Sequence, residues 1–331
     1  MHHKKSFSGD NVILTKDLNF NSRTSYSDLS MTWSYDESEK AYIIDKNSTK
    51  NLRELLIDRN GVGFIAIGNY FNPRISFMGN FDGQNHEIKN LYQNNEYGGL
   101  FGAIYNATIK NLELTDIDIV SNQNAAGITT GCAGISNLYN ICITGKIKGG
   151  NVGGIIGTGG NTIKAINCCN VADIEASEGV GGIIEYIDTN TTVKIINCYN
   201  TGKLYSSSAN GSYGSVSGIL GAAYNKTTSV DFKNICSMGI IEKPKGTGQN
   251  IWLSWDGSTA NLENCYYLDS IINNKVTVNE NTIPFSKSDK TIIEKLNTFV
   301  NQHKDEYDVK LYDWKLDEEG LPTFEITNQA D

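Results

Sequence analysis

Two pairs of acidic residues have a spacing that could support carbohydrate chemistry. Asp116 and Asp118 form one pair, and Asp173 and Glu175 form the other. Residues two apart on a strand project from the same side, so each pair could present two carboxylates together. Paired carboxylates cleave glycosidic bonds, and acidic clusters can bind a calcium ion. These pairs are therefore the candidates for a β-helical lyase or glycosidase.

The intervening sequence argues against that enzyme. Lys146 and Lys148 occupy the equivalent place in the repeat between the two pairs, and alternating charges are usual on a solvated β-sheet face. No Ser/His/Asp set can be assembled, since His86 lies in a turn motif and His303 at the end of a predicted helix. We therefore expect no catalytic residue, no metal site and no cofactor.

Aromatic side chains offer a different chemistry, the binding of a glycan or a protein. The candidates are Tyr205, Tyr213, Trp252 and Trp255, which lie where insertions lengthen the repeat. Insertions in repeat proteins usually form loops on one face, and that face is often the binding face. We expect a ligand to contact this C-terminal half. The alternative, that the two tryptophans belong to the core, stays open.

The elements that would position these residues follow an internal repeat. Each repeat contains three apolar segments of three to five residues, which are too short for helices. Three short strands per repeat favour a parallel β-helix over a propeller. We predict an all-β, right-handed parallel β-helix with about 27–36 residues per coil. The repeat is marked by glycines at spacings of 28, 27, 28 and 36 residues, namely Gly99, Gly127, Gly154, Gly182 and Gly218.

The residue types at the coil corners have predicted roles. The glycines should permit tight corners, where a side chain would clash or φ is positive. Asparagine at the second corner tolerates unusual φ values and bonds local backbone. Cysteines recur five or six residues before the last aliphatic residue of each coil, and we interpret them as buried rungs rather than bridges. A disulfide framework is the alternative for an extracellular protein. These cysteines are Cys142, Cys168, Cys169, Cys198 and Cys236.

The N-terminal region is predicted to cap the solenoid, because an open end exposes strand edges. We assign residues 1–96 to an α/β cap with the first irregular coils. Within it, residues 11–20 are predicted as a strand and residues 48–58 as a helix with Ser48 as its N-cap.

The regular coils are assigned to residues 97–270 and a C-terminal cap to residues 271–331. The cap contains one predicted helix with Ser288 as its N-cap candidate. Its apolar face consists of Ile292, Ile293, Leu296, Phe299 and Val300. The residues expected to plug the last coil are Trp314, Leu316, Leu321 and Phe324.

Several of these segments resemble the GLUG-repeat proteins. The resemblance rests on FDGQNHEIKNLY, GGLFGAIYNATIKNLEL and the repeated GGIIG with INCYNTGKL, and it covers about residues 63–269. It implies a β-helical region of a bacterial surface or secreted protein, as in the non-catalytic regions of immunoglobulin-A-cleaving metalloproteases. The chain has no HExxH motif, wall-anchor motif or signal peptide. The resemblance therefore implies a stalk, spacer or adhesive surface and no proteolysis.

Composition and charge narrow the function classes further. The net charge of −9 argues against nucleic acid as a partner, and no apolar run is long enough for membrane insertion. We expect a non-catalytic extracellular or cell-surface module for adhesion or display, which binds a host or bacterial glycan or protein. A monomer is expected. The first alternative is a trimeric receptor-binding fibre of a phage or virus, and the second is a carbohydrate-active enzyme.

Overall fold

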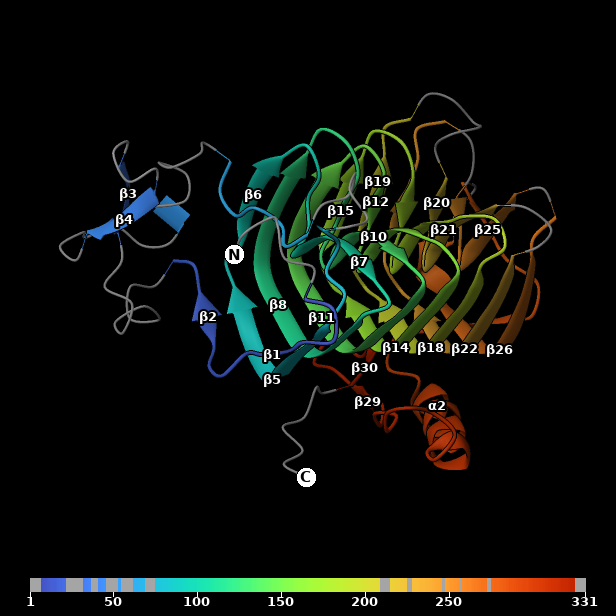
Figure 1. Cartoon of the computed structure of the whole chain (residues 1–331). Helices are drawn as coiled ribbons and strands as arrows, with labels where there is room; N and C mark the ends of the chain where they lie inside the picture. The colour runs from blue at the N-terminus through green and yellow to red at the C-terminus, as the bar shows by residue number, and fades with distance from the viewer. Residues whose placement is uncertain are drawn as a thin grey trace.

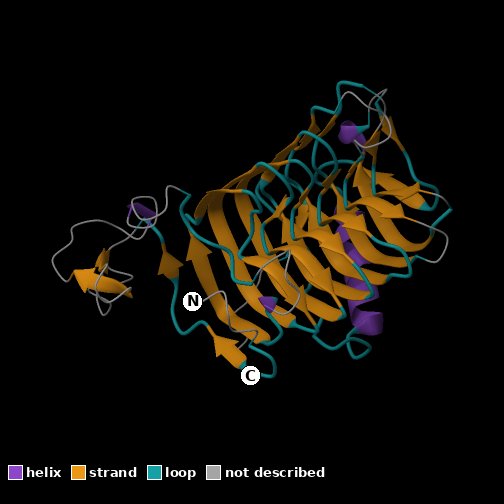
Figure 2. Ribbon diagram, turned by 45° about the horizontal axis from the view of Figure 1, so that its top comes forward, coloured by secondary structure: helices purple, strands orange, loops and turns teal. Residues whose placement is uncertain are grey.

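The described part of the chain forms a parallel β-solenoid of about 6 turns, as the repeat predicted (Figures 1 and 2). The computed structural model describes residues 7–21, 32–36, 41–45, 53–54, 62–68, 75–208, 215–224, 228–245, 248–255, 257–272 and 275–324. The predicted helix at residues 48–58 therefore lies almost entirely outside the described residues. The division of the chain at residues 96 and 270 stays a prediction.

One long sheet forms a side of the solenoid, and each strand along it pairs in parallel with the next. In spatial order its strands are β1 (Asn11–Ile13), β5 (Asn80–Lys89), β8 (Thr108–Ser121), β11 (Ile135–Gly149), β14 (Thr162–Asn170), β18 (Thr192–Asn200), β22 (Ser229–Ser237), β26 (Thr259–Leu268) and β28 (Thr282–Phe285). Further strands attach beside this path, namely β2 (Leu18–Asn19), β6 (Tyr92–Asn95), β15 (Asp173–Ala176), β19 (Leu204–Ser206) and β23 (Ile241–Glu242).

Two six-stranded sheets form the rest of each coil. We call the first the tyrosine sheet; it contains β7 (Phe101–Tyr105), β10 (Thr129–Ala133), β13 (Ile156–Gly159), β17 (Ile184–Ile187), β21 (Leu220–Tyr224) and β25 (Trp252–Trp255). The second, the short sheet, contains β9 (Ala125–Ala126), β12 (Val152–Gly153), β16 (Val180–Gly181), β20 (Val216–Ser217), β24 (Gly248–Gln249) and β27 (Val276–Thr277). A separate antiparallel pair joins β3 (Thr32–Asp36) and β4 (Ala41–Asp45).

The core is built by stacking equivalent residues of successive coils. Ile109, Leu138, Ala165, Ile195 and Phe232 are register partners along the long sheet, and all are fully buried. One coil cannot bury these side chains alone, so each coil depends on its neighbours for its apolar core.

Asparagines form a ladder at one corner of the long sheet, and of their predicted corner role the unusual φ values are confirmed. Their φ values lie between 53° and 58°, a left-handed conformation that asparagine adopts more readily than most residues. From Asn140 onward each side-chain amide donates a hydrogen bond to the asparagine of the preceding coil, at 2.5–2.7 Å, and Asn111 donates to Asp82 at 3.0 Å. The ladder consists of Asn111, Asn140, Asn167, Asn197, Asn234 and Asn264.

Close packing requires glycine at four of the five repeat positions, and a β-carbon at the fifth, Gly99, would make only tight contacts. A β-carbon at Gly154 would overlap the carbonyl oxygen of Gly182, and one at Gly182 would overlap that of Gly218. None of the five has a positive φ, so of the two predicted reasons for glycine, a clash or a positive φ, the clash applies here. The left-handed corner positions belong to the asparagines instead.

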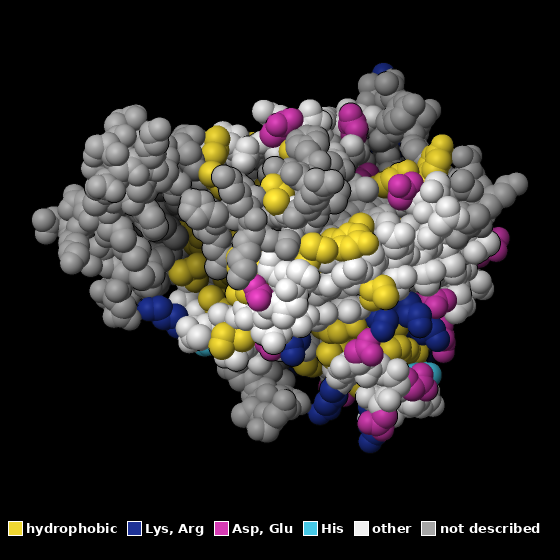
Figure 3. All heavy atoms as spheres, in the orientation of Figure 1, with side chains coloured by type: hydrophobic (Ala, Val, Ile, Leu, Met, Phe, Trp, Pro, Cys, Tyr) yellow, Lys and Arg dark blue, Asp and Glu magenta, His cyan; other side chains and the backbone are white. Residues whose placement is uncertain are grey.

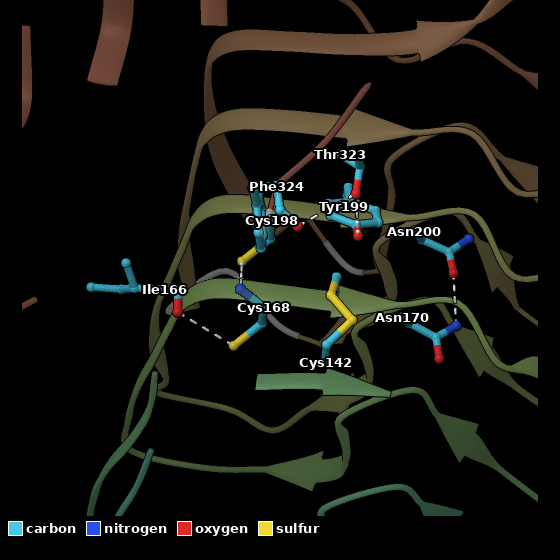
Figure 4. Close-up of a disulfide and its surroundings, with 10 residues drawn as sticks. Cys142, Ile166, Cys168, Asn170, Cys198, Tyr199, Asn200, Thr323 and Phe324 are labelled. Carbon is cyan, nitrogen blue, oxygen red and sulfur yellow. Dashed lines mark hydrogen bonds between the residues drawn. A yellow bond between two sulfur atoms is a disulfide. The ribbon is translucent and has the colours of Figure 1, made fainter. Parts of the chain in front are cut away.

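Two of the five assigned cysteines depart from the prediction of unbridged rungs. Cys142 and Cys169 are register partners on β11 and β14 and form a disulfide (Figure 4). Cys168, Cys198 and Cys236 are free and buried. Because side chains alternate along a strand, Cys168 points to the opposite side from its neighbour Cys169. Sequence spacing could not separate these two orientations.

The predicted C-terminal helix is α2 (Lys290–His303), and it is followed by a short antiparallel pair, β29 (Lys315–Leu316) and β30 (Pro322–Thr323). Its N-cap is Asp289, whose carboxylate accepts from the Thr291 amide, and not Ser288. The expected apolar face is buried except for Ile293, which is partly buried. No helix in the described part of the chain has the length and apolar character needed to cross a membrane.

Residues 308–324, which we call the strap, lie along the outside of the long sheet (Figure 1). Trp314 and Phe324 pack against Tyr199 of β18, with ring centroids 5.7 and 4.9 Å away. The Tyr199 and Thr323 hydroxyls are hydrogen-bonded (Figure 4). The expectation that these aromatic residues plug the last coil is therefore wrong. They cover the flank of the solenoid, because Tyr199 presents an aromatic ring on the outside of β18.

Candidate functional site

The four aromatic residues predicted to bind a ligand differ in their exposure in the structure. Trp252 is a core residue, 9% exposed, and packs against Phe232 with ring centroids 6.1 Å apart. Its assignment as a ligand contact is therefore wrong, and the core alternative holds for it. Tyr205 is partly exposed on β19, between the register partners Glu175 and Glu242. Tyr213 and the side chain of Trp255 lie outside the described residues.

Two other tyrosines form an aromatic pair in the C-terminal half. Tyr186 of β17 and Tyr224 of β21 are partly exposed, and their ring centroids lie 6.3 Å apart. They belong to adjacent strands of the tyrosine sheet, so they stand on successive coils. The backbone register continues the row, because Tyr224 pairs with Trp255 on β25. Aromatic rings on neighbouring coils provide a surface on which a sugar ring or another aromatic group can stack.

Small and polar residues surround this pair. Thr158 is the register partner of Tyr186 on the preceding coil, Ala222 is its partner on the following coil, and Asp188 is exposed two residues further on. Burial first, and then the nearby Asp188 carboxylate, raise the pKa of the Tyr186 hydroxyl. This hydroxyl therefore stays a hydrogen-bond donor at neutral pH. The surroundings leave the tyrosine rings accessible and add polar groups beside them.

Glu185, which directly precedes Tyr186, is the most unusual titratable group in this region. Its side chain is 5% exposed, and a β-carbon at Gly179 would overlap its oxygen Oε1. Burial, with a smaller contribution from Glu178, raises the pKa of the Glu185 carboxyl to about 8. The carboxyl is therefore mostly neutral at pH 7.

The sequence contained a signal for Glu185 that its interpretation missed. In the repeats, the residue after the aliphatic pair is Gly102, Thr130, Gly157, Glu185 and Gly221 in successive coils. A glutamate in a column of small residues breaks the pattern of the repeat. Tyr186 and Tyr224 carry no such signal, because only the coil-to-coil register brings their rings together.

Three of the four acidic residues considered for catalysis form ion pairs, and the fourth, Asp173, accepts a hydrogen bond from the Lys203 backbone amide. Lys146 is the register partner of both Asp118 and Asp173, and the Lys148 ammonium lies 2.7 Å from the Glu175 carboxylate. Asp118 also forms an ion pair with Arg53, at 3.3 Å. The strand register therefore places positive and negative side chains alternately on successive coils, as the sequence predicted.

Asp116, the remaining residue of the first acidic pair, also has a cation beside it. The Lys89 ammonium lies 3.2 Å from the Asp116 carboxylate. On the face seen in Figure 3, charged side chains gather around the C-terminal helix, and much of the solenoid surface above it is uncharged. In the part of the chain that the structure describes, no group of three or more histidine, cysteine or acidic residues is arranged to bind a metal ion.

Comparisons with known proteins support the fold and leave the activity open. No protein-family model matches the chain, and no curated protein matches it either. Among solved structures, the chain is similar to a protein from Bacteroides ovatus described as a "putative immunoglobulin A1 protease", with a TM-score of 0.53 and 23% sequence identity. The match covers 75% of this chain and 78% of the other. At this identity the likeness extends to the β-solenoid fold alone.

Proposed function

We propose that the protein is a non-catalytic extracellular module that mediates adhesion or display by binding a surface glycan or protein. The observation that carries the proposal is the partly exposed Tyr186–Tyr224 pair on successive coils. Paired aromatic rings beside polar side chains are characteristic of recognition surfaces. The ligand face is thus the C-terminal half of the tyrosine sheet.

An extracellular location is supported by the Cys142–Cys169 disulfide. Disulfides persist in oxidising compartments and are rare in the cytosol. The resemblance to GLUG-repeat regions and the fold shared with the Bacteroides ovatus protein are consistent with this location. We propose that the chain is such a region and acts as a binding surface, without proteolytic chemistry of its own.

Adhesion to cells tests the proposal. Beads coated with the parent protein should adhere to host or bacterial cells, and the Tyr186→Ala and Tyr224→Ala variants should lose most of this adhesion. Tyr105→Ala is the matched control, because Tyr105 is 37% exposed on β7 at the other end of the same sheet. Equal adhesion by all four folded proteins would overturn the proposal.

Two further measurements separate the alternatives. Light scattering after size-exclusion chromatography distinguishes the expected monomer from a trimeric receptor-binding fibre. Product analysis after incubation with polysaccharides distinguishes binding from cleavage by a carbohydrate-active enzyme. A stable trimer or released oligosaccharides would favour the corresponding alternative over the adhesion module.

A further inference from the structure

The asparagine ladder holds the strap through groups that the bonds within the ladder leave unused. A side-chain amide has two N–H donors and two acceptor lone pairs, and each rung uses one of each for its neighbours. At Asn167 the amide also donates to the Lys310 carbonyl oxygen at 2.8 Å, and its oxygen accepts from the Tyr312 N–H at 3.2 Å. A carbonyl and an N–H two residues apart point to the same side of an extended chain. One rung therefore binds the backbone of an extended peptide, whatever side chains that peptide carries.

Two rungs at the N-terminal end of the ladder, which we call the open rungs, have the same groups unused. Asn140 donates to Asn111 at 2.7 Å and accepts from Asn167, and Asn111 donates to Asp82 at 3.0 Å. In the part of the chain that the structure describes, neither amide makes a further hydrogen bond. Both open rungs are partly exposed, whereas Asn167 and Asn197, which bind the strap, are fully buried. The surface that binds the strap thus continues uncovered beyond the strap.

The surface beside the open rungs carries negative charge. Glu113 lies two residues after Asn111 on β8 and pairs in register with Glu87 on β5. Its carboxyl forms no hydrogen bond or ion pair within the described residues, although Glu87 has Lys89 at 3.8 Å. Burial first, and then the carboxylates of Glu87 and Asp17, raise the pKa of the Glu113 carboxyl. A cationic side chain of a ligand would relieve this repulsion, so the charge favours lysine or arginine as its partner.

We propose that the open rungs and Glu113 form a docking site for an extended peptide segment of a partner protein that carries a lysine or an arginine. The open rungs bind its backbone as Asn167 binds that of the strap, and its cationic side chain pairs with the Glu113 carboxylate. Cys142, the partly buried register partner of Glu113, provides apolar area for the stem of that side chain. This site lies on the long sheet and is additional to the proposed function of the tyrosine sheet.

Segments of this chain are the competing occupants. Residues 325–331, which follow the strap, contain no lysine or arginine, so the charge does not favour them. Residues 1–6 contain Lys4 and Lys5, and they could compete for the site from the same molecule or from a second copy. A variant with both Lys4→Gln and Lys5→Gln removes this competitor and distinguishes it from a partner protein.

The test measures the binding of a fluorescent octapeptide of alternating threonine and lysine by fluorescence anisotropy. Threonine favours the extended conformation, and the alternation places the lysines on one side of the peptide. The parent protein should bind this peptide saturably, and should not bind the peptide in which glutamate replaces lysine. The same lysine peptide with N-methylated backbone amides keeps its charges but loses its donors, so it should bind about tenfold more weakly. These comparisons require no change in the protein.

Variants locate the site on the protein. Asn140→Gly tolerates the φ of 55° at this position and should weaken binding about tenfold. Glu113→Gln keeps the shape and should weaken binding several-fold at low salt, with less effect at high salt. Asn264→Gly is the control for the rung, because Asn264 has the same φ and a ladder bond at the other end. Glu175→Gln is the control for the charge, since that carboxylate lies in an exposed ion pair. Circular dichroism establishes that each variant is folded.

Each outcome supports or overturns the proposal. Equal binding of the N-methylated and unmodified peptides, or equal losses in folded Asn140→Gly and Asn264→Gly, would overturn it. Clearly tighter peptide binding by the Lys4→Gln, Lys5→Gln variant would assign the site to the N-terminal segment of the chain instead. Adhesion through the tyrosine sheet is measured separately in the cell assay, so this proposal and the proposed function can fail independently.

Discussion

Trp314 donates its indole N–H to the side-chain oxygen of Asn197 at 2.6 Å, although the two residues are 117 positions apart. Asn197 is fully buried and also donates to the Tyr312 carbonyl oxygen at 3.1 Å. The same amide is a rung of the asparagine ladder, with Asn167 and Asn234 on either side. One residue therefore links the coil-to-coil ladder to the strap that covers the long sheet.

The first prediction concerns this link. Replacing Asn197 with Ala should lower the free energy of unfolding by about 2–4 kcal/mol, because buried partners lose hydrogen bonds and a left-handed φ becomes strained. Asn197→Gly tolerates the backbone conformation and should recover only the strain component. Asn111→Ala is the control, since Asn111 has the same φ and a ladder bond but is partly exposed. Urea unfolding that gives equal losses at the two positions would contradict the role of the strap.

The second prediction concerns the thiols. Cys142 and Cys169 are bridged, and the five other cysteines are free and buried. Unfolding without reductant should therefore release five thiols to a thiol reagent, and unfolding with reductant should make all seven cysteines reactive. The native protein should react slowly, because burial raises the pKa of thiols such as Cys132, to about 12, and disfavours the reactive thiolate. Release of seven thiols without reductant would exclude the bridge.

The third prediction concerns the coil corners. Gly154→Ala should destabilise the protein by about 1–3 kcal/mol, because the added carbon overlaps the Gly182 carbonyl of the next coil. Gly160→Ala provides a matched control, since a β-carbon there meets no heavy atom within 4 Å. Thermal unfolding of the two variants measures the difference. A similar melting temperature for both would show that the glycine column is not set by contact between coils.

The fourth prediction concerns the pH dependence of stability. The Glu185 carboxyl has a pKa of about 8 in the folded protein, against the ordinary glutamate value of 4.5. Between these pH values the folded state keeps a proton that the unfolded state releases. Its contribution to the free energy of unfolding should therefore fall as pH rises from about 4.5 to about 8, by at most ~1.4 kcal/mol per pH unit, and then level off.

Glu185→Gln removes this titration and isolates its effect. The stability of the variant relative to the parent should increase with pH across the same window, in urea unfolding at pH 5, 6.5 and 8. Glu175→Gln, at an exposed ion pair with Lys148, should show no such trend. A constant difference between Glu185→Gln and the parent at the three pH values would mean that the carboxyl is already ionised when folded.

The sequence by itself determined the solenoid and much of its chemistry. Glycines at nearly fixed spacing and short apolar segments predict coils that bury their core only by stacking, because none of the segments has helical length. The corner role of asparagine and the alternating charges around Lys146 and Lys148 followed from the same repeat. These features are local, or recur at one period, so a linear pattern contains them.

Only the tertiary structure decided which residues meet across coils and where the C-terminal region lies. Cys142 and Cys169 are 27 residues apart, and a shift of one position in register would have put Cys168 in place of Cys169. Tyr186 and Tyr224 become neighbours through the pairing of β17 with β21. The strap turns back over β18 because Tyr199 offers it apolar area and the Asn197 amide, already bonded along the ladder, also donates to the Tyr312 carbonyl. Such contacts depend on the exact pairing of strands and on the path of the chain in space. The repeat pattern of the sequence does not specify which individual side chains meet.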